Sequence, residues 1–88
     1  MGVELTLEIQ TTIQGQFTRM RRAVDLLAVP LPGDRISIEF WKEGVRVRSR
    51  EFLLDGSVVL DLGWHRFDGE GAVNQLHDDG WQRVQSDS

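Results

Sequence analysis

The sequence predicts a small, mainly β domain: an antiparallel five-strand meander that forms a small barrel or a strongly bent sheet, with one short C-terminal helix. Three observations carry this prediction. The first stretch alternates strictly between apolar and polar residues, turn signals rich in glycine and proline divide the chain, and only one segment near the C-terminus favours a short helix. The 88 residues allow one core. We therefore expect a single β-rich domain at residues 1–84 and a frayed polar tail at residues 85–88.

The first strand is predicted at residues 3–14, where the hydrophobic period is two. A helix would need apolar residues three and four positions apart, and this stretch does not have them. One face should therefore be buried and the other wet. The residues predicted to face the core are Val3, Leu5, Leu7, Ile9 and Ile13.

A hairpin loop at Gly15-Gln16 would pair this strand with a second one that ends near Leu27. The apolar and polar faces of the two strands then match along the ladder, and Arg22, placed opposite Ile9, is the one exception. The alternative is an α+β fold with a helix at about residues 17–28, because several apolar residues in this stretch also stand at helical spacing. We favour the hairpin.

Two further hairpins are predicted after the proline-rich connection at residues 29–34. A third strand, Arg35 to Trp41, should turn at Glu43-Gly44 into a fourth strand at residues 45–54. Asp55-Gly56 is the strongest hairpin signal in the chain, and a two-residue turn there leads into a fifth strand. This arrangement leaves Phe52, Leu54 and Val59 apolar on the outward face, and we expect the rest of the chain to cover them.

The C-terminal part should form a short helix from Ala72 to Asp79. If Gly80 is left-handed, Leu76 and Trp81 occupy the two positions whose side chains touch in a Schellman cap. Trp81 is therefore expected in the core, and residues 81–84 are expected to add a short edge strand. Trp41 is expected to be exposed, whereas the pattern does not decide the burial of Trp64.

Composition limits the classes of function. The net charge is −4, residues 1–60 are neutral, and residues 61–88 carry six acidic and two basic side chains. This balance is opposite to that of a nonspecific nucleic-acid binder. The absence of cysteine excludes a disulfide framework and fits a reducing compartment. With neither a signal peptide pattern nor a long apolar run, we expect a cytoplasmic protein that does not engage a membrane.

The candidate binding residues are arginines and one tryptophan on the predicted outward face. Planar guanidinium groups interleaved with aromatic rings suit phosphates and unstacked bases. The competing interpretation, which we favour, is cross-strand charge pairing with the neighbouring carboxylates Glu8, Glu39 and Asp61. The candidate residues are Arg19, Arg21, Trp41, Arg46, Arg48 and Arg50.

Catalytic and metal-binding patterns are not found. His65 and His77 belong to no triad, dyad or phosphate loop, and the neighbouring residues Asp78 and Asp79 point in different directions on a helix. We therefore expect no catalytic residues, no metal and no cofactor.

The function expected from the sequence is that of a noncatalytic binding or assembly module that engages a protein partner. The alternative is a nucleic-acid or anion-binding sheet that uses the arginines. Long edge strands with few lysines also lead us to expect a homodimer at high concentration. The sequence does not identify the partner.

Overall fold

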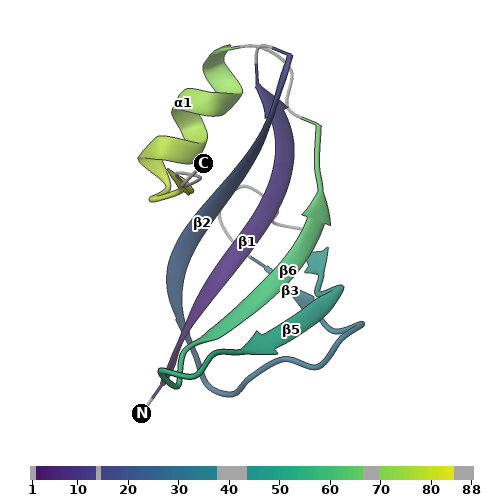
Figure 1. The fold of residues 1–88 in the computed structure, drawn as a ribbon, viewed down its shortest axis with the longest axis vertical. Coiled ribbons are helices and arrows are strands. Elements are labelled where there is room, and N and C mark those ends of the chain that lie inside the picture. The colour runs from purple at the N-terminus through teal and green to yellow at the C-terminus, as the bar shows by residue number, and fades with distance from the viewer. Residues whose placement is uncertain (1, 14, 38–43, 67–69, 85–88) are drawn as a thin grey trace.

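The first strand of the chain is the central strand of a five-stranded sheet, with the order β5-β6-β1-β2-β7 (Figure 1). The computed structural model describes residues 2–13, 15–37, 44–66 and 70–84. The large sheet contains β1 (Val3–Ile13), β2 (Gln16–Leu26), β5 (Ser49–Phe52), β6 (Val58–Trp64) and β7 (Gln82–Arg83). A separate two-stranded sheet contains β3 (Arg35–Ile36) and β4 (Val45–Arg46), and the helix α1 spans Glu70–Asp78.

The β1–β2 hairpin confirms the predicted second strand, so the alternative helix at residues 17–28 is wrong. Ile13 pairs with Gln16, which places the loop one residue earlier than predicted. Every cross-strand partner consequently shifts by two positions, and the two faces keep their predicted sides. Arg22 now stands opposite Leu7, and Ile9 stands opposite Met20.

The predicted antiparallel meander is wrong, because β6 lies parallel to β1. Leu7 pairs with Leu60 and Glu8 with Asp61 in this parallel ladder. Over the described residues the sheet is therefore mixed, and it stays open with β5 and β7 at its edges, so the predicted barrel does not form there. The physical reason is visible in β6, where Val58, Val59 and Leu60 are all buried. A strand buried on both faces suits a position inside the sheet.

The predicted fourth strand is divided between the two sheets. The N–H of Val47 donates to the Asp34 carbonyl at 2.9 Å, whereas the next N–H, of Arg48, donates to the Asp61 carbonyl at 2.7 Å. The chain thus passes from the small sheet to β6 within two residues. Ile36 and Val45 are buried and pair with each other. A short turn at Glu43-Gly44 would instead place Ile36 opposite Ser49 or Glu51, so the predicted register of this hairpin is wrong. The rest of the predicted third strand, residues 38–41, and the expected exposure of Trp41 lie outside the described residues.

The Asp55-Gly56 signal does mark a hairpin, but its loop has three residues. The Leu53 N–H donates to the Ser57 carbonyl at 2.8 Å, and Gly56, with a φ of 90°, takes the left-handed position in the loop. Phe52 therefore pairs with Val58, one residue away from the predicted register. Since a shift of one residue exchanges the faces of a strand, Arg50 stands opposite Leu60 and not opposite Asp61.

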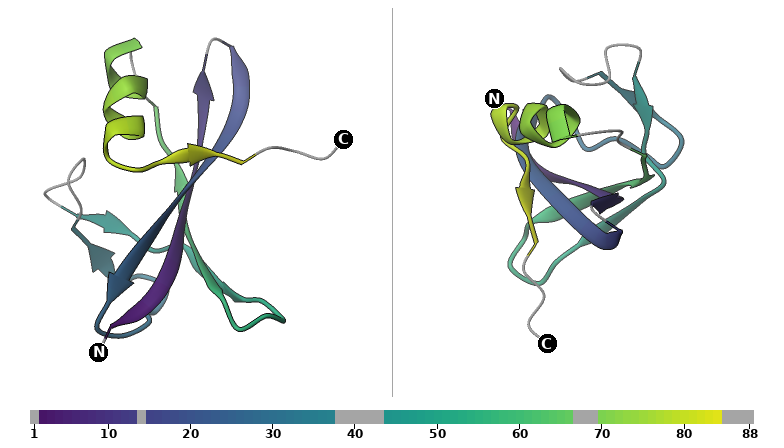
Figure 2. Two further views of the ribbon diagram at one scale, coloured as in Figure 1. Left: turned by 90° about the vertical axis from the view of Figure 1, so that its left-hand side faces the viewer. Right: turned by 90° about the horizontal axis from the view of Figure 1, so that it is seen from above.

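The helix α1 ends in the predicted Schellman cap. The Trp81 N–H donates to the Leu76 carbonyl at 2.9 Å, the Gly80 N–H donates to the His77 carbonyl at 3.0 Å, and Gly80 has a φ of 96°. Leu76 and Trp81 are both buried in the core cluster, as expected. After the cap, β7 pairs with β2 as the predicted short edge strand. Figure 2 shows α1 leading into β7, which lies beside β2 at the edge of the sheet.

The core lies between the apolar face of the large sheet, the small sheet and α1. Its buried residues are Leu5, Leu7, Ile9, Ile13, Met20, Ile36, Val45, Val47, Val58, Leu60, Leu62, Leu76 and Trp81. The predicted apolar side of β1 is confirmed, except that Val3 at its end is 38% exposed.

Two tryptophans provide a matched test of this packing. Trp81 is 1% exposed and Trp64 is 52% exposed. We expect Trp81→Ala to lower the free energy of unfolding by about 3–5 kcal/mol because it leaves a cavity under the cap. Trp64→Ala should change it by less than about 1 kcal/mol. Urea unfolding measures both, and similar losses for the two variants would contradict the described packing.

Candidate functional site

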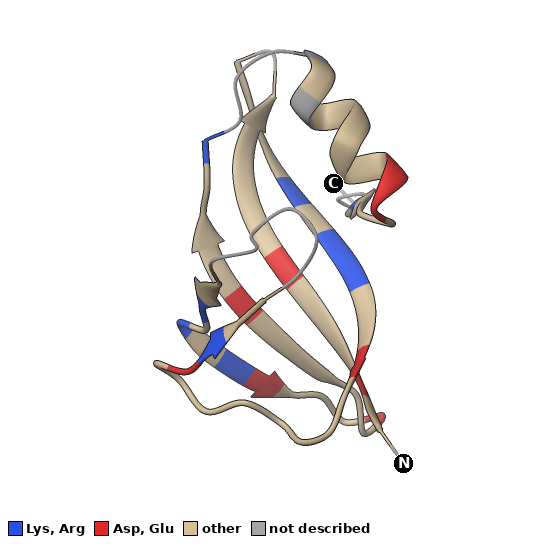
Figure 3. Ribbon diagram, turned by 180° about the vertical axis from the view of Figure 1, so that it is seen from behind, with Lys and Arg blue, Asp and Glu red and all other residues tan. Residues whose placement is uncertain are grey.

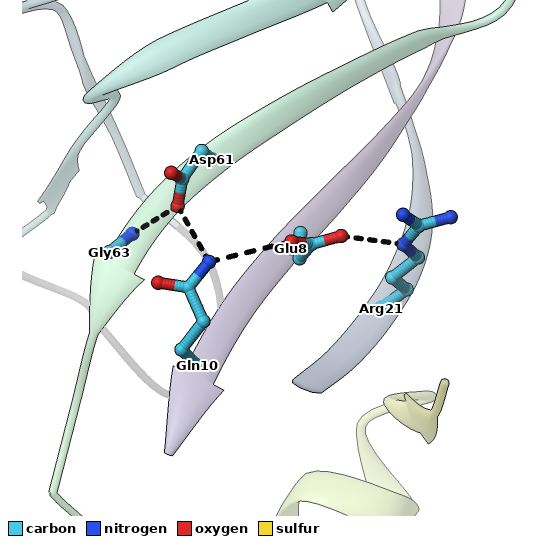
Figure 4. A network of polar contacts seen from close by, with 5 residues as sticks. All are labelled: Glu8, Gln10, Arg21, Asp61 and Gly63. Atoms are coloured by element: carbon cyan, nitrogen blue, oxygen red, sulfur yellow. Dashed lines mark hydrogen bonds and ion pairs between the residues drawn. The ribbon is translucent and has the colours of Figure 1, made fainter. Parts of the chain in front are cut away.

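A row of polar side chains crosses the three central strands on the face opposite the core. Arg21 on β2 and Asp61 on β6 both pair with Glu8 on β1. The Arg21 Nε donates to Glu8 Oε2 at 2.7 Å, and Gln10 Nε2 lies 3.4 Å from Glu8 Oε1 and 3.3 Å from Asp61 Oδ1. Asp61 Oδ1 also accepts the Gly63 N–H at 2.8 Å. Figure 4 shows these residues, which we call the polar row.

The side chains of the polar row bond to one another across the sheet. Glu8 is only 8% exposed, and its carboxylate is held by Arg21 and by the Gln10 amide. Cross-strand pairing of Arg21 with Glu8 is the interpretation that we favoured for the outward arginines. Arg50 does not pair with Asp61 across the ladder, because the hairpin register differs from the predicted one.

The arginines predicted as one binding surface lie in two separate regions. Arg19 and Arg21 are on β2, whereas Arg46 is on β4, Arg48 follows it, and Arg50 is on β5. Figure 3 shows basic residues along β2 and around β4 and β5, with acidic residues on β1 and β6 between them. The remaining candidate, Trp41, lies outside the described residues. The anion-binding role of this set stays a prediction.

Arg48 and Arg50 have local packing roles. A β-carbon at Gly63, whose φ is 86°, would lie 2.7 Å from Arg48 Cδ, so Arg48 packs directly over this glycine. The Arg50 guanidinium carbon lies 5.3 Å from the centre of the Phe52 ring, within the range of a cation–π contact.

The β5–β6 hairpin carries an apolar surface that the described part of the chain leaves exposed. Phe52 is 62% exposed, Leu53 is 36% exposed and Leu54 is fully exposed. We call these three residues the apolar hairpin. The expectation that the C-terminal segment covers Phe52 and Leu54 is wrong, because β7 pairs with β2, and Figure 2 shows α1 away from the β5–β6 hairpin. Val59, the third residue of that expectation, is buried within the sheet.

A groove beside β7 brings together two arginines that the sequence did not single out as binding residues. It has a volume of about 660 Å³, and Arg21, Arg22 and Arg83 line it together with Asp79. We call it the arginine groove. Arg22 did give a signal in the sequence, as the one charged residue that broke the apolar face of its strand. Arg83 gave none, because its position depends on the pairing of β7 with β2.

The histidines give no sign of a catalytic or metal site in the described ranges. His65 Nε2 lies 2.8 Å from the Leu62 carbonyl oxygen and donates to it, and His77 is exposed in the last turn of α1. Within these ranges, no three or more His, Cys, Asp or Glu residues are grouped so that they could hold a metal ion. The described residues also contain no helix with the length and apolar character needed to cross a membrane.

Comparisons with known proteins find no match to this chain among family models, curated proteins or solved structures. The function is therefore argued from the apolar hairpin, the polar row and the arginine groove.

The ion pair in the polar row should have a measurable effect on stability. We expect Arg21→Gln to lower the free energy of unfolding by about 1–3 kcal/mol, because the largely buried Glu8 carboxylate loses its charged partner. Adding Glu8→Gln should restore part of this loss, since no unpaired carboxylate then remains. A double-mutant cycle by urea unfolding, with the exposed Arg19→Gln as the control, measures the coupling. Additive effects of the two substitutions would contradict it.

Asp55, in the loop of the apolar hairpin, should have a lowered pKa. The Ser57 hydroxyl donates to Asp55 Oδ1 at 2.6 Å and the Ser57 N–H donates to it at 2.9 Å, and these bonds lower the pKa of Asp55 below its ordinary value of 3.8. This stabilisation of the loop is present above the ordinary pKa and is lost as the pH falls through the lowered one. NMR titration should show Ser57→Ala raising the Asp55 pKa; an unchanged pKa would refute the role of Ser57.

Proposed function

We propose that this protein is a noncatalytic binding module that engages a protein partner through the apolar hairpin. The observation that carries the proposal is the run of three exposed apolar residues, Phe52, Leu53 and Leu54, at the end of an edge strand. Contiguous exposed apolar surface is typical of interaction sites, and aromatic residues dominate the energetics of many interfaces.

The hairpin presents these side chains in a defined conformation, which favours binding. The loop is closed by the Leu53–Ser57 backbone hydrogen bond, and Asp55 accepts two hydrogen bonds from Ser57. Arg50 stacks over Phe52 and limits the rotation of its ring. A binding surface that is already ordered loses less entropy when the partner arrives.

The partner is expected to contact β5 as well as the tip of the hairpin. Three side chains alone bury much less than the 1,200 Å² or so of a stable interface. Within the described residues, β5 pairs only with β6, so its outer edge can receive an extended segment of the partner. We therefore infer a partner that adds a strand to β5 and places apolar side chains against the apolar hairpin.

The other parts of this proposal rest on the sequence. The lack of cysteine supports a cytoplasmic location, where thiols stay reduced. A homodimer through β5 is the second form of the same interaction, with another copy of the chain as the partner.

A photocrosslinking experiment in the native host tests the proposed surface. A crosslinking amino acid at position 54 should give a discrete protein adduct, and Phe52→Ser should abolish it. The control places the same group at Leu27, a leucine that is 91% exposed on the connection after β2. A heavier adduct with a foreign protein supports a distinct partner, and an adduct of twice the chain mass supports the homodimer. Equal labelling from both positions, or an adduct that survives Phe52→Ser, would reject the apolar hairpin as the binding surface.

A further inference from the structure

The arginine groove lies where the outer edge of β2 is left open by the short strand β7. Within the described residues, β7 pairs only with Met20 and Arg21 of β2, so the edge from Arg22 onward has no strand beside it. The groove extends over this open edge and has a volume of about 660 Å³. Its polar lining residues are Thr6, Arg21, Arg22, Asp79, Gln82 and Arg83.

The groove concentrates positive charge on a protein that is negative as a whole. Its three arginines, less Asp79 and the Glu8 that pairs with Arg21, give a formal charge of 3 − 2 = +1, whereas the chain carries −4. Clefts lined by one sign of charge raise the local concentration of ligands of the opposite sign. An anion is therefore the class of ligand that the groove should attract.

Arg21 is held in position for such a ligand. Its Nε donates to Glu8, and its side chain remains 40% exposed. Figure 4 shows the Arg21 Nε directed at Glu8 and one of the two terminal nitrogens pointing away from it. The ion pair thus fixes the direction of the side chain through Nε, and at least one terminal nitrogen points away from Glu8.

The other two cations approach from the C-terminal segment and from the neighbouring position on β2. A β-carbon at Gly80 would lie 3.8 Å from Arg22 Nε, so Arg22 runs beside the Schellman cap. Arg83 stands on β7, opposite Met20. The three arginines therefore line one groove from different backbone positions, and Thr6 and Gln82, which also line it, carry a hydroxyl and an amide that can donate to a ligand.

The side chains that line the arginine groove favour some kinds of anion over others. Guanidinium groups bind phosphate and carboxylate oxygens through paired hydrogen bonds, and such charge-assisted bonds are stronger than neutral ones. The volume falls in the range of small-molecule sites and exceeds that of one phosphate. The residues that line the groove include no aromatic side chain on which a base could stack, which disfavours single-stranded nucleic acid.

We propose that the arginine groove binds a small molecule with two linked phosphate groups, held by Arg21, Arg22 and Arg83. The two phosphates offer several oxygens to the arginines that line the groove, and their negative charge is opposite to the local excess of positive charge. Asp79 also lines the groove, and its carboxylate would repel the anion from its own position. This site is separate from the apolar hairpin, and its ligand belongs to a different class.

Titration with inorganic pyrophosphate, followed by NMR and calorimetry on the whole chain at about 50 mM salt, tests the proposal. Saturable binding should shift the amide signals of Arg21, Arg22 and Arg83. Arg83→Gln should weaken binding by about tenfold or more, because a charged partner of the phosphate is lost. Arg46→Gln removes the same charge from the exposed strand β4 and should leave the affinity within about twofold.

Further measurements separate this site from general charge attraction and from the apolar hairpin. Arg22→Lys keeps the charge but removes the planar fork, and should weaken binding several-fold. Phe52→Ser should leave pyrophosphate binding unchanged, so the two proposals fail independently. Equal losses for Arg83→Gln and Arg46→Gln would overturn the groove, as would the absence of saturable binding at millimolar pyrophosphate. Tighter binding of a single-stranded oligonucleotide that Arg83→Gln does not weaken would reject the site in favour of a nucleic-acid surface elsewhere.

Discussion

The rest of the structure depends on the position of β1, which lies between two neighbouring strands and buries one face in the core. Leu5, Leu7 and Ile9 are almost fully buried, with β2 on one side and β6 on the other. Because side chains alternate along a strand, this burial also fixes where Glu8 and Gln10 must point. The apolar face thus determines the core, and the opposite face receives the polar row. A shift of β1 by one residue would exchange the two.

The sequence predicted those parts of the fold that depend on neighbouring residues. The first hairpin, the short helix and the cap at Gly80 were all predicted, since each is specified by residues that lie close together in the sequence. The parallel pairing of β6 with β1 was missed, because hairpin signals report only on strands that follow each other. The run Val58-Val59-Leu60 was a usable signal for it, since all three residues are buried and a strand that is apolar on both faces belongs inside a sheet.

The candidate site was predictable to a smaller extent, for a related reason. Alternation placed Arg46, Arg48 and Arg50 on one side of a single strand, but the backbone of Val47 and Arg48 bonds to two different segments, and the strand is divided there. Because the loop at Asp55-Gly56 has three residues and the predicted turn has two, Arg50 stands opposite Leu60 and not opposite Asp61. By contrast, Arg22 interrupted the apolar pattern of β2, and it lines the arginine groove. An exception to a regular pattern was therefore more informative about the site than the pattern itself.

The two proposed surfaces use the two edges of one sheet, and the polar row lies between them. A ligand at Arg21 does not require the Glu8 ion pair to break, because the contact to Glu8 uses Nε, and one terminal nitrogen points away from Glu8. Glu8 is buried, and losing its partner would leave an uncompensated charge, so the stability of the fold favours keeping Arg21 in this orientation. The interaction that stabilises the sheet and the interaction that would bind an anion are therefore compatible. Consequently, the groove can be occupied while the strands that carry the apolar hairpin keep their positions.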